Sequence, residues 1–457
     1  MHHVVRLLIS LCLIFSCASS AMASGEAVEK AYEWLKAQQV PNNIVSYPVM
    51  KRRHFVLSFE LNHDNPQNQN DKSFQYIFSR SSLYDNALAI IAFVMMDDFK
   101  RASQIIESLY RNIDDKGLLW FTYNTHNNWP DETDSSWAIS RNGASAWAGY
   151  AILFYIQAKF KKENMNVNKK NIEDNPELKD YLSLCRLIAD YILTWQIQDK
   201  KDNRYGLIVG GLNRLELVYD ESKKSVYEKF IEGATPWVSV EHNIDAYFFL
   251  RDLAKLSEDE KYEERAESLR QALLNKAWNE EFAQFARGVR ETGQDTALAL
   301  DCASWGSLFA WAVGEKDKAA QSYKAAEKYK IFQNKDKNIY GYKPYLSGLV
   351  YEEQVDVNTY YFPQKPDASW KNFDMVWPEG SLGVALASLK LGDIKKTKSI
   401  LAAMEHFQSS SGGVMYADKD VPYQFSTSPS VAGTAWFIMV SQSLKNENFK
   451  NLFWSED

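Results

Sequence analysis

Two kinds of helical segment alternate along the chain, and this alternation restricts the fold more than any other feature. One kind is apolar nearly all round and must be buried; it covers residues 83–97, 143–158, 241–256, 298–313, 379–391 and 430–443. The other kind is amphipathic and covers residues 25–39, 98–112, 176–196, 258–277, 316–330 and 393–407. Six buried and six covering helices in alternation predict two concentric rings, an inner barrel and an outer jacket.

The connections between these segments predict where a site would form. Short links, such as Asp97-Asp98 and Gly392-Asp393, join each inner helix to the next outer helix. The links from outer to inner helices are long, at 113–142, 197–240, 331–378 and 408–429. All long loops then lie on one face, with the N-termini of the inner helices. A solenoid of helix pairs is the alternative, but successive inner helices are too far apart for its repeat of about 34 residues. We predict one all-α domain, an (α/α)6 toroid, over residues 24–457.

The N-terminus has the pattern of an export signal. Arg6 precedes a short apolar run at 7–15, and the small residues at 21 and 23 match a cleavage site. We therefore predict a signal peptide over residues 1–23 and an exported protein, periplasmic or extracellular. No other stretch is apolar for long enough to span a bilayer.

Charge and cysteine usage exclude several classes of protein. Processing leaves Cys185 and Cys302, both in apolar helical segments, which favours two buried free thiols over a disulfide. The remaining histidines lack ligand spacing, so we predict no metal site and no cofactor. Without Arg6 the chain carries 51 basic and 59 acidic residues, a formal net charge of −8. This balance, without a basic run, argues against nucleic acid and anionic membranes as partners.

One stretch, from Trp237 to Tyr247, concentrates polar groups at the start of a buried helix. It places four of them within five positions: Glu241, His242, Asn243 and Asp245. Ser239 fits the N-cap, so Glu241 falls in the first turn, where free N–H groups favour negative charge. A capped helix with a satisfied histidine is the alternative interpretation.

The same arrangement recurs at the other inner helices. In chain order, their first turns offer Tyr84, Asp85 and Asn86; Arg141, Asn142 and Trp147; Asp301 and Trp305; Trp377 and Glu379; and Thr434 and Trp436. A single acid there would only complement the helix dipole, an effect of about 0.3–1 kcal/mol. Four carboxylates at equivalent ends, Asp85, Glu241, Asp301 and Glu379, predict instead a shared cavity on the barrel axis.

Aromatic rings in the long loops indicate what this cavity binds. Rings with a polar edge suit a partner such as a sugar, which has an apolar C–H face and a wet rim. Packing within the loops is the alternative for any one ring. We therefore expect a carbohydrate substrate, contacted by Arg141, Asn142, Trp147, His242, Asn243, Asp245, Trp129, Asp134, Trp305, Trp377, Tyr423 and Trp436. The acidic run 131–134 would also suit calcium, although a solvated turn is favoured.

The two-ring pattern and three short motifs resemble the six-hairpin (α/α)6 glycosidase-like proteins. The motifs are Tyr84-Asp85-Asn86-Ala87, Glu241-His242-Asn243-Ile244-Asp245 and Val376-Trp377-Pro378-Glu379-Gly380. The resemblance covers nearly all of the mature chain in helix count and matches no single glycosidase family. It implies a substrate cleft across the inner-helix N-termini, with catalytic Asp or Glu residues there. Polysaccharide lyases and phosphorylases share this architecture, so the fold does not determine the chemistry.

Glycoside hydrolysis needs a protonated carboxyl as general acid and an ionised one as base or nucleophile. We expect Glu241, between the apolar Val240 and Ile244, to be the acid and Glu379 to be the base, with Asp85 and Asp301 as alternative bases. Two other functions stay open: a non-catalytic glycan-binding or assembly protein, and a polysaccharide lyase with Tyr84, Tyr423 or His242 as base.

Overall fold

The structure is a computed structural model that describes residues 25–61, 77–127, 137–220, 222–223, 225–347, 368–421 and 424–456. Its helices are one at 25–38, α4 (Leu83–Met95), α5 (Phe99–Asn112), α6 (Asn142–Lys162), α7 (Lys169–Glu173), α8 (Pro176–Leu193), α9 (Val240–Ser257), α10 (Glu260–Ala272), α11 (Leu300–Ala312), α12 (Lys316–Ala326), α14 (Pro378–Lys390), α15 (Ile394–Met404), α16 (Val431–Lys445) and α17 (Glu447–Leu452). Its strands are β1 (Arg80–Ser82), β2 (Thr122–Asn124), β3 (Gly211–Asp220), β4 (Ser225–Thr235), β5 (Val238–Ser239), β6 (Trp278–Asn279), β7 (Gln284–Phe285), β8 (Gly288–Arg290), β9 (Gly293–Asp295), β10 (Lys330–Asn334) and β11 (Ile339–Tyr342).

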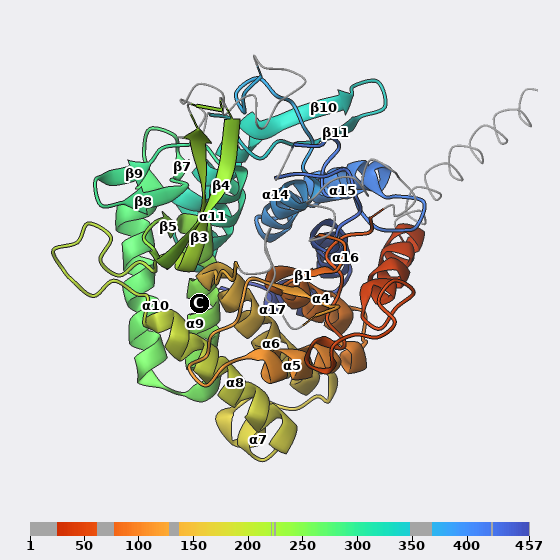
Figure 1. Ribbon diagram of the computed structural model, residues 1–457, viewed down its shortest axis with the longest axis vertical. Coiled ribbons are helices and arrows are strands. Elements are labelled where there is room, and N and C mark those ends of the chain that lie inside the picture. Colours follow the sequence, from red (N-terminus) through yellow and green to blue (C-terminus); the bar gives the residue numbers. More distant parts are fainter. Residues whose placement is uncertain are drawn as a thin grey trace, which may run out of the picture.

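The inner ring is a closed circle of buried helices. In the order α4, α6, α9, α11, α14 and α16, each helix contacts the next, and α16 returns to α4 (Figure 1). Three of them begin with a serine N-cap, Ser82, Ser239 or Ser430, whose hydroxyl accepts a first-turn N–H. Because these helices are apolar on every face, burial in a ring is the arrangement that removes most of their surface from water.

The outer ring covers the inner one. Helix α5 packs against α4 and α6, α8 against α6 and α9, α10 against α9, α12 against α11 and α14, and α15 against α14 and α16. The helix at 25–38 lies outside α4, where the ring of Tyr32 is 6.3 Å from that of Phe93. Asp98 and Asp393 cap α5 and α15: the carboxylate of each accepts a hydrogen bond from a first-turn N–H. The predicted (α/α)6 toroid is confirmed.

The loops contain short strands that the sequence analysis did not predict. Strands β3 and β4 form an antiparallel hairpin that runs from the pair Gly211 and Thr235 to the pair Asp220 and Ser225. The other sheets are β1 with β2, β6 with β7, β10 with β11, and β5 with β8 and β9. Every one of these sheets is antiparallel and short, so the fold stays all-α in class.

Two further expectations concern single residues and the membrane. Cys185 and Cys302 are buried free thiols, as predicted. Within the described ranges, no helix is both long enough and apolar enough to cross a bilayer. The predicted signal peptide, 1–23, lies outside the described residues.

The contact between α6 and α9 is close enough to test the ring packing. A Cβ atom on Gly149 would lie 2.2 Å from Cζ of Phe249, which is buried on the facing helix. Glycine at this position therefore allows the two inner helices to approach.

We predict that Gly149→Ala lowers the free energy of unfolding by about 1–3 kcal/mol, because the methyl group overpacks the contact. Without that clash, the same change in a helix interior would stabilise the protein by about 1 kcal/mol. Chemical denaturation of the two single variants, Gly149→Ala and Phe249→Leu, and of the double variant measures the interaction free energy between positions 149 and 249. Recovery of stability in the double variant is expected, and a stabilised Gly149→Ala would contradict the packing.

Candidate active site

Four carboxyl groups meet at the N-terminal ends of inner helices. Glu241, Asp301 and Glu379 are each the second residue of their helices, α9, α11 and α14, and Asp85 is the third residue of α4. Their charges act on one another: Glu241 and Glu379 raise the pKa of Asp301, and Asp85 and Glu241 raise that of Glu379. The structure therefore brings the four predicted catalytic carboxyls into one site.

Burial makes these carboxyls unusually weak acids. It raises the pKa of Asp85 to about 6, of Glu241 to about 7 and of Glu379 to about 8. It also raises the pKa of Asp301 well above its usual range. Glu241 keeps partial contact with solvent, whereas Asp85, Asp301 and Glu379 are at most 8% exposed. Since protein atoms still surround the Glu241 carboxyl, its loss of hydration dominates its titration.

A chain of hydrogen bonds supports the charged form of one carboxyl. The Trp436 indole Nε1 donates to the Tyr84 hydroxyl over 2.9 Å, and this hydroxyl donates to Glu379 Oε1 over 2.6 Å. The Tyr84 hydroxyl lowers the pKa of Glu379, against the larger effect of burial. The structure describes no hydrogen bond to the Glu241 carboxyl among the placed residues. The two glutamates therefore differ in environment, as an acid and a base must.

A second layer of side chains lies beneath the first. Trp147, Asp245, Trp305 and Trp436 are each the sixth residue of their helices, α6, α9, α11 and α16. Four helical residues place this layer roughly 6 Å deeper than the second residues. The three indole rings pack together with centroids 5.7–6.0 Å apart, and all three are buried. They form an apolar floor below the carboxyls.

Two carboxyl oxygens at this site have no hydrogen-bond partner among the described residues. They are Oδ1 of Asp301, in the first layer, and Oδ1 of Asp245, in the second. Burial raises the pKa of Asp245 well above its usual range, and the charges of Glu241 and Asp301 raise it further. Buried polar atoms are nearly always satisfied in folded proteins, so unpaired oxygens in a shared site indicate that a ligand or water completes them.

Three polar residues at the starts of α6 and α9, Arg141, Asn142 and Asn243, are hydrogen-bonded to the backbone of the neighbouring loop. Asn243 uses both amide N–H groups on the carbonyls of Ile208 and Ser239. Asn142 donates to the carbonyl of Val209 and Arg141 to that of Asn213, at the base of the β3–β4 hairpin. These contacts give Asn243 a structural role, so its predicted part in substrate binding has no support from its own contacts.

His242 is neutral over the physiological range. Burial and the nearby Arg141 lower its pKa to about 4. Its Nδ1 has no hydrogen-bond partner among the placed residues. It therefore offers a neutral ring nitrogen next to Glu241. Trp377, the N-cap of α14, is buried next to Glu379 and lowers the pKa of that residue.

The structure adds a residue to the site that sequence reasoning did not select. Tyr416 is partly buried close to the acids. Burial raises the pKa of its hydroxyl, and the charges of Glu379, Asp85 and Asp301 raise it further. Tyr416 does not sit at the start of an inner helix, so helix patterns gave no signal for it. Tyr84 was selected from the sequence as a first-turn residue and a candidate lyase base, but not as a hydrogen-bond donor to Glu379.

Three predicted binding residues, Trp129, Asp134 and Tyr423, lie outside the described residues, as does the acidic run 131–134. Among the residues that are described, no group of three or more His, Cys, Asp or Glu side chains is arranged to hold a metal ion.

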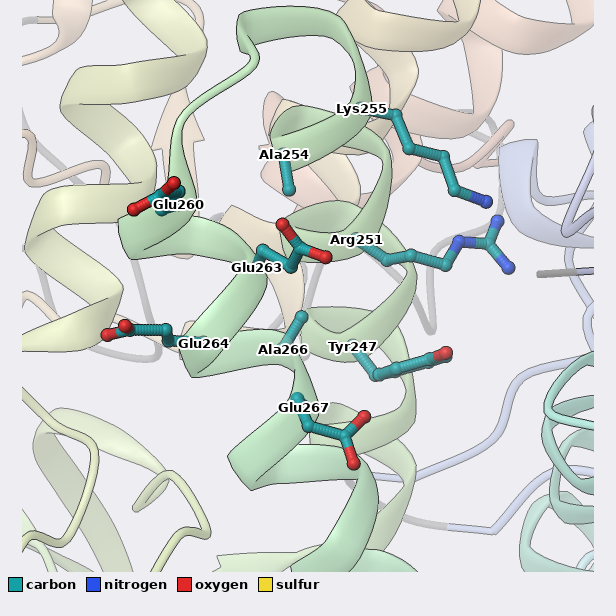
Figure 2. A pocket seen from close by; sticks show the side chains of 9 residues that line it. All are labelled: Tyr247, Arg251, Ala254, Lys255, Glu260, Glu263, Glu264, Ala266 and Glu267. Atoms are coloured by element: carbon teal, nitrogen blue, oxygen red, sulfur yellow. The ribbon is translucent and has the colours of Figure 1, made fainter.

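A pocket of about 740 Å³ lies elsewhere, between the later turns of α9 and the outer helix α10. Figure 2 shows Tyr247, Arg251 and Lys255 on α9 pointing to the same side as Glu263 and Glu267 on α10. The four glutamates that line it are exposed, and none of the buried carboxyls described above belongs to it. It therefore lacks the paired, desolvated acids that a reaction centre of this kind needs.

Comparison with known proteins gives matches in structure only. No protein-family model and no curated protein matches the chain. A glycosidase variant in complex with glucose is 10% identical, with 93% of this chain and 98% of that one covered and a TM-score of 0.54. An α-amylase from Clostridium perfringens is 11% identical, with 91% and 97% covered and a TM-score of 0.55. A cellobiose 2-epimerase from Bacillus thermoamylovorans is 10% identical, with 92% and 98% covered and a TM-score of 0.53. The chain thus shares its fold with a glycosidase, an α-amylase and a cellobiose 2-epimerase.

Proposed function

We propose that the protein is an exported glycoside hydrolase that cleaves an oligo- or polysaccharide by paired-carboxylate catalysis. The observation that carries this proposal is the cluster of desolvated carboxyls at the inner-helix N-termini, two of which keep an unpaired buried oxygen. Similarity to glycosidases in fold supports it. Export rests on the apolar segment and cleavage pattern of residues 1–23.

Glu241 is suited to be the general acid. Burial raises its pKa to about 7, so that about half of it holds a proton at neutral pH. It is also the member of the cluster with most contact to solvent, and hence the one that a leaving-group oxygen reaches first. A general acid works best when its pKa is close to the working pH.

Glu379 is suited to be the base or nucleophile. The hydrogen bond from the Tyr84 hydroxyl stabilises its charged form, and the indole of Trp436 fixes that hydroxyl. Once Glu379 is ionised, its negative charge favours the protonated form of Glu241, because like charges repel at short range. Asp301 and Asp245 then offer their unpaired oxygens to sugar hydroxyl groups. Asp85 acts on this group through its charge on Glu379.

The alternatives have less support from the site. For a lyase with Tyr84 as base, burial and the charge of Glu379 are unfavourable, because they raise the pKa of its hydroxyl well above the usual value. His242, which is neutral, is the alternative base, and Tyr423 lies outside the described residues. A glycan-binding protein without activity would have no reason to keep several acids protonated by burial. Incubation of the protein with a panel of glucans and uronate-containing oligosaccharides, with mass analysis of the products, separates these functions. Hydrolysis adds water to the products, a lyase reaction forms an unsaturated product, and an isomerase leaves the mass unchanged.

Removal of either catalytic carboxyl is predicted to abolish turnover. Glu241→Gln and Glu379→Gln should each lower kcat by about 10²–10⁴-fold, because the amide can neither give nor take the proton. KM should change little, since the amide keeps the shape of the side chain. Glu267→Gln, on the outer helix α10, is the matched control and should retain parental kcat. Release of reducing ends at the parental rate by both site variants would overturn the assignment.

The pH dependence of kcat/KM follows from the raised pKa values. Below about pH 7 both Glu241 and Glu379 hold protons and no base is present; above about pH 8 both are charged and no acid is present; between these values the two carboxyls share a single proton, so that one can act as acid and the other as base. Activity should therefore be bell-shaped with its maximum between these values, and fall about tenfold per pH unit beyond each limb. Initial rates at low substrate concentration measure this profile. A maximum near pH 5 would show that the carboxyls are not desolvated.

Loss of the Tyr84 hydroxyl is predicted to weaken the base. Tyr84→Phe keeps the ring that packs against Trp147 at 5.5 Å but removes the donor to Glu379. Because the carboxylate loses a charge-assisted hydrogen bond, its pKa, about 8 in the parent, should rise, and the alkaline limb of the profile should move to higher pH. We expect a loss of at least about tenfold in kcat at pH 7, because less Glu379 is ionised. An unchanged alkaline limb would show that another carboxyl sets it.

A further inference from the structure

The end of the chain enters the barrel and fills its axis. After α17, the side chains of Phe453 and Trp454 are both 1% exposed. The backbone N–H of Trp454 donates to the Tyr150 hydroxyl over 2.8 Å. Trp454 has a φ of 44°, a left-handed conformation that bulky side chains rarely adopt. Such a conformation persists only where the surroundings determine it, so the site of insertion is specific.

Trp454 contacts all three tryptophans of the second layer, which come from three different inner helices. Its ring lies 5.4 Å from that of Trp147, 5.4 Å from that of Trp305 and 6.3 Å from that of Trp436. On its other side it stacks on Phe248 of α9 at 4.8 Å. A single side chain from the C-terminus thus supports the apolar floor from below.

Two of these tryptophans connect the floor to the reacting groups. Trp436 donates to the Tyr84 hydroxyl, which donates to Glu379, and Trp147 packs edge-on against Tyr84 at 5.5 Å. The sixth residue of α14 is Gly383, which has no side chain to add to the floor. The Trp305 indole leans over that glycine, whose added Cβ would lie 2.9 Å from Trp305 Nε1.

The terminus is anchored as well as inserted. Arg251 donates to the backbone carbonyl of Ser455 over 2.6 Å and to its hydroxyl over 3.1 Å. Arg251 is itself buried and paired with Asp252. This charged anchor at the far end of α9 fixes how far Trp454 reaches along the barrel axis.

We propose that Trp454 is a positioning residue for the active site: it holds the indoles of Trp147, Trp305 and Trp436 in place and, through Trp436 and Tyr84, sets the orientation of Glu379. This role rests on the proposed glycosidase function. It assigns a part in the reaction to the last residues of the chain, which are far in sequence from every catalytic carboxyl.

Kinetics of two variants at position 454 and one control test the proposal. Trp454→Leu keeps an apolar side chain but loses the contact with the indoles, and should lower kcat about tenfold to a hundredfold with KM within about twofold. Trp454→Phe keeps a ring and should restore most of kcat. Phe449→Leu is the matched control: it weakens the docking of α17 against Phe154 and touches none of the three indoles. Equal losses of kcat in Phe449→Leu and Trp454→Leu, measured well below their melting temperatures, would overturn the proposal.

A second measurement does not depend on activity. Protein labelled with [15N]tryptophan gives one indole N–H signal for each tryptophan, and Trp436→Phe identifies the signal of Trp436. In Trp454→Leu this signal should shift and exchange faster with water, because the hydrogen bond to Tyr84 loosens, while Phe449→Leu should leave it unchanged. Indole signals that stay at parental positions in Trp454→Leu would reject the positioning role. A parent without activity on any glycan would reject the glycosidase function alone, and the signal of Trp436 would still decide whether Trp454 holds the indoles.

Discussion

The removal of several carboxyl groups from water is the constraint on which the rest of the site depends. An ionised carboxylate in an apolar interior is costly, and neighbouring acids repel one another, so a buried cluster stays partly protonated. The inner-helix N-termini reduce this cost, because their free N–H groups and dipoles favour negative charge at the positions of Glu241, Asp301 and Glu379. A ring of such ends is one of the few places where a protein can gather acids at this density.

A second layer of side chains, beneath the carboxyls on the barrel axis, removes the carboxyls further from water. The carboxyls at the second residues lie above tryptophans at the sixth residues, and those tryptophans exclude water from below. Exclusion of water raises the pKa of the acids and strengthens each hydrogen bond made to them. The bond from Tyr84 to Glu379 is therefore effective because it lies between the two layers. The carboxyls and the apolar floor thus follow from two repeated helix positions, the second and the sixth residues of the inner helices.

The ring was predictable because its signal is local and repeated. Helical segments such as 143–158 are apolar on every face, and the first-turn acids mark the same end of each buried helix. The partners of these acids were not predictable, because they come from distant parts of the chain. The hydroxyl of Tyr84 meets Glu379, the hairpin at 211–235 rests on Arg141, and Trp454 meets Trp147. For Asn243 the position predicted a contact with a ligand, but its side-chain amide donates a hydrogen bond to the backbone carbonyl of Ile208.

The fold alone does not select hydrolysis, since the structures that share it at 10–11% identity include an epimerase as well as glycosidases. The groups at the helix ends decide between such reactions. Isomerisation of a free sugar needs a strong base beside a carbonyl group, whereas the cleavage of a glycosidic bond needs a proton donor close to a carboxylate. In this site, burial raises the pKa values of Glu241 and Glu379 to about 7 and about 8, the Tyr84 hydroxyl donates to Glu379, and His242 stays neutral because its pKa is lowered to about 4. Two neighbouring carboxyls that share a proton near neutral pH fit the proposed cleavage of a glycosidic bond.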